Sequence, residues 1–126
     1  MGLIETLRLK IGAVRERTSH VSMTVEEIHH NYVGTLHGGV VSTLIDIAIA
    51  RAIRDVIDPN EVIATVALNL TFIHAVSSGD LNARGRVTFK GNRLAHGEAE
   101  VYAGDQIIAR GTGTWYISRK KTAATD

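Results

Sequence analysis

The amino-acid sequence predicts a single α+β domain in which one antiparallel sheet wraps around one long central helix. Three observations lead to this fold class: an apolar helical pattern covers residues 40–56, four strand patterns follow it, and only short turns separate those strands. Long adjacent strands joined by short turns pair antiparallel. The chain of 126 residues suits one domain, residues 1–126, and shows neither an internal repeat nor a second domain.

The segment before the central helix carries two weaker patterns. Four apolar residues recur at helical spacing near its start: Leu3, Ile4, Leu7 and Ile11. They predict a short amphipathic helix that ends at Gly12. Residues 13–25 then alternate between apolar and polar types and predict the first strand. A polar loop follows at residues 26–36, in which His29 and His30 are expected to be solvated.

The central helix is apolar on more than one side. Seven residues form a broad stripe that can pack on a sheet: Val41, Leu44, Ile45, Ala48, Ile49, Ala52 and Val56. Asp46 lies on the other side, where a lone carboxylate is costly to bury unless a partner pairs with it or a reaction uses it. A second subunit or a ligand is therefore expected on that side. Residues 58–60, which include Pro59, should stop the helix.

Four strands are expected after the helix, with turns at residues 77–80, 91–92 and 104–105. Their patterns cover residues 62–72, 81–90, 93–103 and 106–118. Residues 119–126 are polar and lack periodicity, so they are expected to form a frayed tail.

The composition narrows the possible functions. The formal net charge of +1 argues neither for nor against nucleic-acid binding, and the absence of cysteine excludes disulfides and thiolate metal sites. The six histidines lack metal-ligand spacing, so no metal is expected. The first residues do not resemble a signal peptide, and no uninterrupted apolar run reaches the roughly 20 residues of a membrane span. A cytoplasmic protein without nucleic-acid or membrane partners is therefore expected.

A glycine-rich polar loop, residues 31–39, leads into the central helix. The N–H groups of Gly38 and Gly39 can approach a ligand closely because glycine has no side chain. A helix N-terminus attracts negative charge, which suits the oxyanion that develops on an acyl carbonyl. Asp46 lies two turns further along and is a candidate base or nucleophile. Spacing alone also allows a plain tight turn and an ordinary paired or solvated Asp46.

The loop and helix together carry a recognisable motif. The pattern Asn-x-x-Gly-x-x-His-Gly-Gly begins at Asn31, and Asp46 follows its last glycine by seven residues. This pattern resembles the signature of hotdog-fold acyl-CoA thioesterases of the phenylacetate-pathway and thioesterase-superfamily type, related to the 4-hydroxybenzoyl-CoA thioesterases. The resemblance covers nearly the whole chain. It implies a hotdog fold and hydrolysis of an aryl- or fatty-acyl-CoA thioester, with no cofactor besides the CoA of the substrate.

The resemblance also implies roles for single residues. Asp46 falls at the catalytic carboxylate, which acts either as general base or as nucleophile. Gly38 matches the residue whose N–H polarises the thioester carbonyl, and Gly39 is expected beside the substrate. Asn31 matches a residue that orients water or the carbonyl, and His37 is expected to orient the loop.

Substrate and subunit contacts are implied less directly. His74 falls where some relatives carry Ser or Thr, so its role as a substrate-binding residue departs from the family pattern. Three basic residues are candidates for binding the CoA phosphates: Arg84, Lys90 and Arg93. A homodimer or homotetramer is expected, with Asp46 of one chain facing the region of His37 and Gly38 in another.

Two other functions stay open at this point. One is a hotdog dehydratase or hydratase that acts on acyl thioesters of CoA or acyl carrier protein. Those enzymes use a different arrangement of histidine and acid, which the pattern from Asn31 to Asp46 fits less well. The other is a non-catalytic acyl-CoA-binding domain with the same fold.

Overall fold

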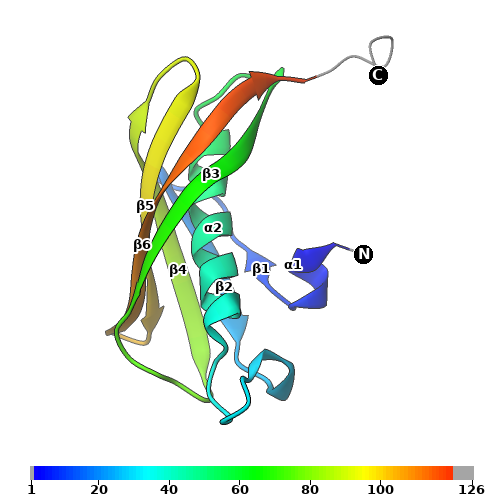
Figure 1. The fold of residues 1–126 in the computed structure, drawn as a ribbon, viewed down its shortest axis with the longest axis vertical. Helices are drawn as coiled ribbons and strands as arrows, with labels where there is room; N and C mark the ends of the chain where they lie inside the picture. Colours follow the sequence, from blue (N-terminus) through cyan, green and yellow to red (C-terminus); the bar gives the residue numbers. More distant parts are fainter. Residues whose placement is uncertain (1, 121–126) are drawn as a thin grey trace.

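A curled six-stranded sheet surrounds one long helix in the computed structural model, which describes residues 2–120 (Figure 1). The elements follow in the order α1 (Leu3–Thr6), β1 (Lys10–Ile11), β2 (Thr18–Thr24), the short 3-10 helix η1 (Glu27–His29), α2 (Gly38–Arg54), β3 (Glu61–Phe72), β4 (Asp80–Lys90), β5 (Leu94–Ala103) and β6 (Gln106–Arg119). Neither helix in this part of the chain has the length and apolarity needed to cross a membrane.

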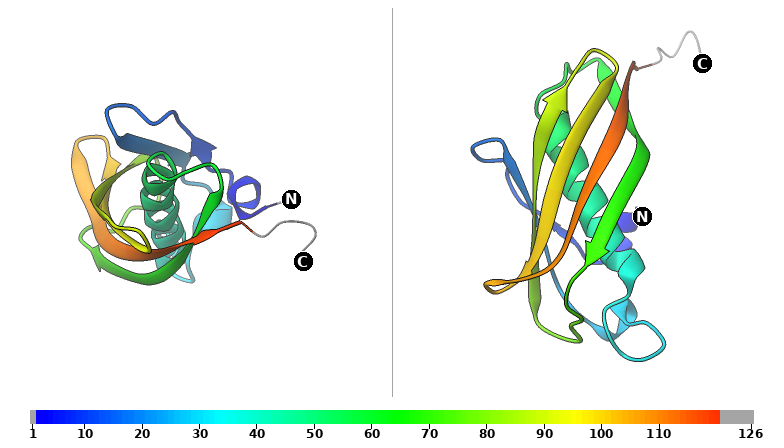
Figure 2. Two further views of the ribbon diagram at one scale, coloured as in Figure 1. Left: turned by 90° about the horizontal axis from the view of Figure 1, so that it is seen from above. Right: turned by 60° about the vertical axis from the view of Figure 1, so that its left-hand side comes forward.

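The strands lie in the order β1-β2-β4-β5-β6-β3, and every neighbouring pair is antiparallel. Seen from above, the sheet bends around α2, with the helix at its centre (Figure 2). β3 follows α2 in the sequence but lies at the far edge of the sheet, paired only with β6. The predicted α+β class, with one antiparallel sheet around one helix, is confirmed.

More of the surface of α2 is buried than a flat sheet would cover. Eight of its residues are buried: Val40, Val41, Leu44, Ile45, Ala48, Ile49, Ala52 and Ile53. Ile53, expected near the Asp46 side, is fully buried because the curled sheet covers more than one face of the helix. Val56, expected in the stripe, lies beyond the end of α2 and is exposed.

Glycines in the sheet let α2 approach it closely. A Cβ atom added to Gly85 would lie 2.4 Å from the carbonyl oxygen of Ala48, and one on Gly97 would lie 2.3 Å from the Ile49 side chain. Side-chain carbons do not approach that closely, so only glycine fits. The buried hydroxyl of Ser19 also donates a hydrogen bond to the Ala48 carbonyl. The middle of α2 is thereby fixed against β2, β4 and β5.

The N-terminal segment differs from its prediction. α1 ends at Thr6, and Ile11 belongs to strand β1 instead of the helix. The chain turns away after α1 because Arg8 adopts a left-handed conformation with φ of 58°. The first long strand begins at Thr18 instead of residue 13, because a tight turn with positive φ at Glu16 and Arg17 precedes it.

The four later strands match their predicted ranges to within one residue at each end. Three residues, not two, connect β4 to β5, and the turn is closed by a hydrogen bond from the Gly91 N–H to the Leu94 carbonyl. The expected tail starts too early, since Arg119 pairs with Glu61 in the sheet. The Lys120 N–H also donates to the Asn60 carbonyl. Residues 121–126 lie outside the described residues.

Candidate active site

The first turn of α2 has one backbone N–H group that is available to a ligand. His37 caps the helix: its Nδ1 atom accepts a hydrogen bond of 2.8 Å from the Gly39 N–H. The N–H groups of Val40 and Val41 point to the His37 carbonyl oxygen at 3.0 and 3.3 Å. Among the described residues, the Gly38 N–H has no acceptor. Of the first four N–H groups of the helix, this one is therefore available to a ligand.

The two adjacent glycines serve different purposes. A Cβ atom on Gly39 would lie 3.1 Å from Nδ1 of His37, so glycine leaves room for the capping ring. The Gly39 N–H thus serves the cap and is not free for the substrate contact expected of it. A Cβ atom on Gly38 would meet only the Phe72 ring, at 3.5 Å. Glycine at this position therefore leaves open the space between the helix and Phe72.

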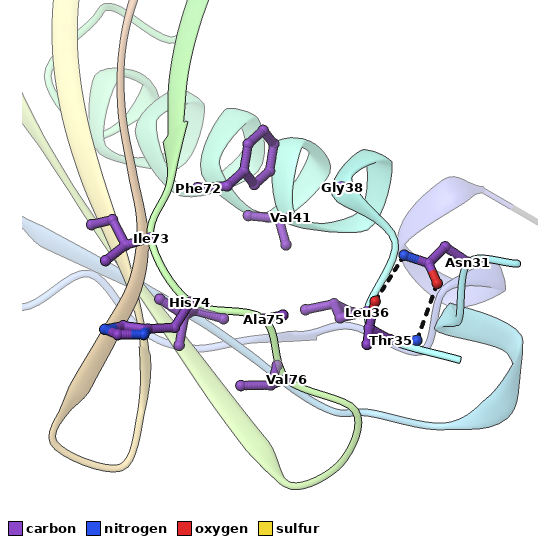
Figure 3. A pocket seen from close by; sticks show the side chains of 11 residues that line it. Asn31, Thr35, Leu36, Gly38, Val41, Phe72, Ile73, His74, Ala75 and Val76 are labelled. Atoms are coloured by element: carbon purple, nitrogen blue, oxygen red, sulfur yellow. Dashed lines mark hydrogen bonds between the residues drawn. The ribbon is translucent and has the colours of Figure 1, made fainter. Parts of the chain in front are cut away.

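Asn31 organises the loop before the helix (Figure 3). Its Oδ1 atom accepts hydrogen bonds from the N–H groups of Val33 and Thr35, at 3.0 and 3.1 Å. Its Nδ2 atom donates to the Thr35 hydroxyl at 2.8 Å. Gly34 adopts φ of 84° within the same loop, a conformation that favours glycine. The Asn31 side chain therefore shapes the loop and keeps one Nδ2 hydrogen for a further acceptor.

His29 lies behind this loop and is completely buried, in contrast to the solvated loop histidine expected from the sequence. Its Nδ1 atom accepts from the Glu26 N–H at 2.9 Å, and its Nε2 atom donates to the Leu7 carbonyl at 2.7 Å. Its own carbonyl accepts from the His37 N–H at 2.8 Å. The ring thus links the N-terminal segment to the residue that caps α2. No sequence periodicity signals such a role for a histidine in a loop.

A pocket of about 300 Å³ opens beside the α2 N-terminus (Figure 3). Three of the predicted site residues line it: Asn31, Gly38 and His74. Most of its wall is apolar and includes Leu36, Val41, Phe72, Ile73, Val76 and Ile108. The His74 ring points away from Asn31 in this view. The pocket therefore combines a free N–H with an apolar wall, which suits an acyl carbonyl and its attached hydrocarbon.

Asp46 lies outside this pocket. It is half-buried on α2, and its Oδ1 atom accepts a hydrogen bond of 2.9 Å from the Thr65 hydroxyl of β3. The sequence gives no sign of this partner, because the pairing depends on how the sheet curls. Asp46 follows Gly38 by eight positions, which corresponds to about 12 Å along the helix axis. Within one chain, the two groups are thus too far apart to act on one carbonyl carbon.

The three basic residues expected at the CoA phosphates lie away from the pocket. Arg84 stacks over the Tyr102 ring at 4.7 Å, on the outer face of the sheet. Lys90 ends β4 and shares a hollow with Asp55, just beyond α2. Arg93 belongs to the same β4–β5 turn, at the opposite end of the molecule from the start of α2 (Figure 1). One chain therefore does not bring these cations to Gly38.

The principal ion pairs also lie on the outer face. Arg86 binds Glu98 at 2.9 Å and forms a double hydrogen bond with Glu100. The contacts with Glu100, followed by those with Glu98, raise the pKa of Arg86 above its ordinary value. Within residues 2–120, no group of three His, Asp or Glu side chains is arranged to hold a metal ion.

Comparison with known sequences gives consistent matches. The model of the family described as the thioesterase superfamily matches residues 33–109. PA0474 of Pseudomonas aeruginosa, whose name describes it as a candidate esterase, is 32% identical over 103 residues, which cover 81% of this chain and 77% of that protein. A 1,4-dihydroxy-2-naphthoyl-CoA hydrolase of Listeria monocytogenes is 30% identical over 83 residues, covering 66% of this chain and 68% of that protein.

Solved structures share the fold over almost the full length. The conserved protein PA5202 of Pseudomonas aeruginosa superposes with a TM-score of 0.89 at 25% identity, and the match covers 94% of both chains. A thioesterase family protein of Silicibacter pomeroyi gives a TM-score of 0.88 at 24% identity, over 95% of this chain and 91% of that one. These similarities confirm that the curled sheet around α2 is the hotdog fold.

Proposed function

The chain belongs to the thioesterase superfamily, and from this premise we propose that it is an acyl-CoA thioesterase that releases a free acid and CoA. The observation that carries the proposal is the unpartnered N–H of Gly38 at the α2 N-terminus, opening on an apolar pocket. The thioester carbonyl accepts a hydrogen bond from this N–H, and the helix dipole adds to the stabilisation of the oxyanion. One such donor contributes about 3 kcal/mol to transition-state stabilisation.

The proposed reaction needs the carboxylate of Asp46 from a second copy of the chain. A distance of about 12 Å along α2 separates Asp46 from the Gly38 of its own chain. β3 is a 12-residue edge strand whose Val62 and Val66 are 40% and 61% exposed. Long apolar edge strands tend to pair with another chain. The proposed assembly is a homodimer in which two β3 strands pair antiparallel, or a homotetramer built from it, so that each site uses both chains.

Asp46 then acts in one of two ways. As a general base, it takes a proton from water, and the hydroxide attacks the thioester carbon. The tetrahedral intermediate collapses to the carboxylic acid, and the CoA thiolate leaves and takes up the proton. As a nucleophile, Asp46 displaces the thiolate and forms an anhydride, which water hydrolyses to restore the carboxylate. Its hydrogen bond from Thr65 orients the carboxylate in either case.

The proposed acyl group is aryl or fatty, because the pocket of about 300 Å³ is mainly apolar. The 1,4-dihydroxy-2-naphthoyl-CoA hydrolase name of the Listeria monocytogenes relative supports an aryl-CoA substrate. Arg84, Lys90 and Arg93 remain proposed contacts for the CoA phosphates, and all three need a neighbouring chain to reach a site at Gly38.

The direct test measures CoA release from a panel of aryl- and fatty-acyl-CoA thioesters with a thiol reagent. Hydrolysis of at least one thioester, and its loss in Asp46→Asn, is expected. Asp55→Asn is the matched control, because Asp55 is an exposed aspartate at the other end of α2. Hydration of an enoyl-CoA without hydrolysis would contradict the proposal in favour of a hydratase. Saturable acyl-CoA binding without turnover would indicate a binding domain.

A complementation experiment tests the shared site. Gly38→Pro removes the N–H at the first position of the helix, which tolerates proline, and His37 already has the extended conformation that precedes proline. Gly38→Pro and Asp46→Asn should each be inactive alone. Co-expressed in equal amounts, they should regain about a quarter of wild-type activity, because half of the dimers then contain one intact site of two. No recovery would contradict the shared site. It would indicate either that Gly38 and Asp46 of the same chain form one site or that the two residues act in different sites.

A further inference from the structure

Phe72 is an exposed aromatic side chain that faces the free donor of α2. It is the last residue of β3, on the same inner face as Leu70, and pairs with the buried Ala109 of β6. Because β3 is the edge strand and ends there, the Phe72 side chain remains 56% exposed. Exposed aromatic surface of this size gains free energy when an apolar group covers it.

The Phe72 ring has a defined position relative to Gly38. Its Cε1 and Cζ atoms lie 3.5 Å from the position that a Cβ atom on Gly38 would occupy. The backbone after the ring is held in place, since the N–H groups of Ile73 and His74 both donate to the Ile108 carbonyl at 2.8 and 3.1 Å. The ring therefore lies beside Gly38, whose N–H is proposed to bind the carbonyl, and the backbone that follows it is held by hydrogen bonds.

We propose that Phe72 is a specificity-determining residue that limits the bulk of the acyl group on the carbon next to the thioester carbonyl. A carbonyl bound to the Gly38 N–H places that carbon in the space between the helix and the Phe72 ring, which Gly38 leaves unfilled. An unbranched or planar acyl group passes the ring edge and reaches the apolar wall beyond it. A group branched at that carbon collides with the ring. This inference rests on the proposed thioesterase function.

The test compares two ligands of equal carbon number and different shape. Non-hydrolysable ketone analogues of hexanoyl-CoA and of 2,2-dimethylbutanoyl-CoA differ only in branching next to the carbonyl. Their dissociation constants are measured by calorimetry for the wild type, Phe72→Ala and Phe72→Leu. The wild type should prefer the unbranched analogue, Phe72→Ala should reduce that preference at least about tenfold, and Phe72→Leu should fall between them.

The chain offers a closely matched control. Phe89, the only other phenylalanine, is 54% exposed and lies near the β4–β5 turn, far from the pocket. Phe89→Ala should leave the preference unchanged. An unchanged preference in both Phe72 variants would overturn the inference, and Phe72→Leu supplies the answer if Phe72→Ala does not fold.

The outcomes for the inference and for the proposed function are separate. A wild type that binds the analogues but hydrolyses no acyl-CoA would refute the thioesterase function, while the binding preference would still test Phe72. A wild type that binds neither analogue would overturn both. Where hydrolysis is observed, the ratio of kcat/KM for the two corresponding thioesters should change in Phe72→Ala in the same direction as the binding ratio.

Discussion

The two sides of α2 are built on different physical principles. Toward β4 and β5, on what we call its sheet side, the helix lies against glycines that leave no space for one additional carbon atom. Toward the edge strand β3 and at its N-terminus, on what we call its open side, it carries half-buried or exposed polar groups, among them Asp46 and His37, held by a few hydrogen bonds. The sheet side therefore determines whether the chain folds. The open side can change its chemistry at little cost in stability.

The largest expected effect belongs to the sheet side. Gly85→Ala places a Cβ atom 2.4 Å from the Ala48 oxygen and 2.8 Å from the Ile49 nitrogen, and these backbone atoms cannot move aside separately. Overpacking of this kind should lower the free energy of unfolding by more than about 3 kcal/mol. Denaturant unfolding measures it. Gly38→Ala is the control, because its Cβ atom meets only the Phe72 ring at 3.5 Å; equal stability of both variants would contradict the distinction.

On the open side, Asp46→Asn should lower the activity strongly and change the stability little. Hydrolysis should fall at least about a hundredfold, since the amide neither accepts the proton of water nor forms an anhydride. The free energy of unfolding should change by less than about 1 kcal/mol, because the Thr65 hydroxyl can still donate to the amide oxygen. Steady-state kinetics and denaturant unfolding are measured on the same preparation. Loss of activity that merely follows loss of folded protein would make Asp46 a structural residue.

His29→Leu tests how the loop beside the open end is held. Leucine keeps most of the buried volume but leaves the Leu7 carbonyl and the Glu26 N–H without their partners. The expected loss is about 2 kcal/mol of unfolding free energy, the cost of unsatisfied buried polar groups. His30→Leu is the control, because His30 is half-buried and, within the described residues, its ring forms one hydrogen bond, to the Ser77 carbonyl. A His29→Leu protein as stable as this control would show that packing alone holds the loop.

Among the variants that are expected to lose stability, His37→Ala should lose the least. It removes the cap that accepts the Gly39 N–H, and loss of an N-cap costs about 1 kcal/mol. His37→Asn should restore much of this stability, because asparagine is a good N-cap. Thermal unfolding of the three proteins measures both effects. A His37→Ala protein with unchanged melting temperature would show that the cap does not hold the first turn.

Periodicity predicted the regular elements because it reflects burial directly. The alternation in residues 106–118 comes from inward and outward side chains of β6. In β3 the alternation matches burial only at Leu68 and Leu70, because a register shift lies between Thr65 and Ala67 and leaves Val62 and Val66 exposed. The helical stripe likewise follows from the sheet-facing side of α2. Periodicity did not predict the short elements. The two residues of β1 are too few to show a period, and the spacing of Ile11 fitted a helix by coincidence.

The sequence could predict only those features of the site that neighbouring residues form. Gly38 adjoins the helix start, so an available backbone N–H there could be expected, whereas the cap that His37 forms with the Gly39 N–H was not predicted. The hydrogen bond from Thr65 to Asp46 spans 19 positions and depends on the curl of the sheet. The position of Lys90 depends on which end of the sheet carries the β4–β5 turn. Neither long-range fact is encoded in a local pattern.

The close contact between α2 and the glycines of the sheet also has a consequence for motion. Amide hydrogens in the middle of the helix, around Ala48, can exchange with solvent only when the whole domain opens, because local displacement meets backbone on the sheet side. The loop at residues 31–35 is held by the Asn31 side chain and by backbone hydrogen bonds within the loop, so its amide hydrogens are expected to exchange through local openings. We therefore expect entry of a ligand into the pocket to depend on fluctuations of the surrounding loops and not on movement of α2.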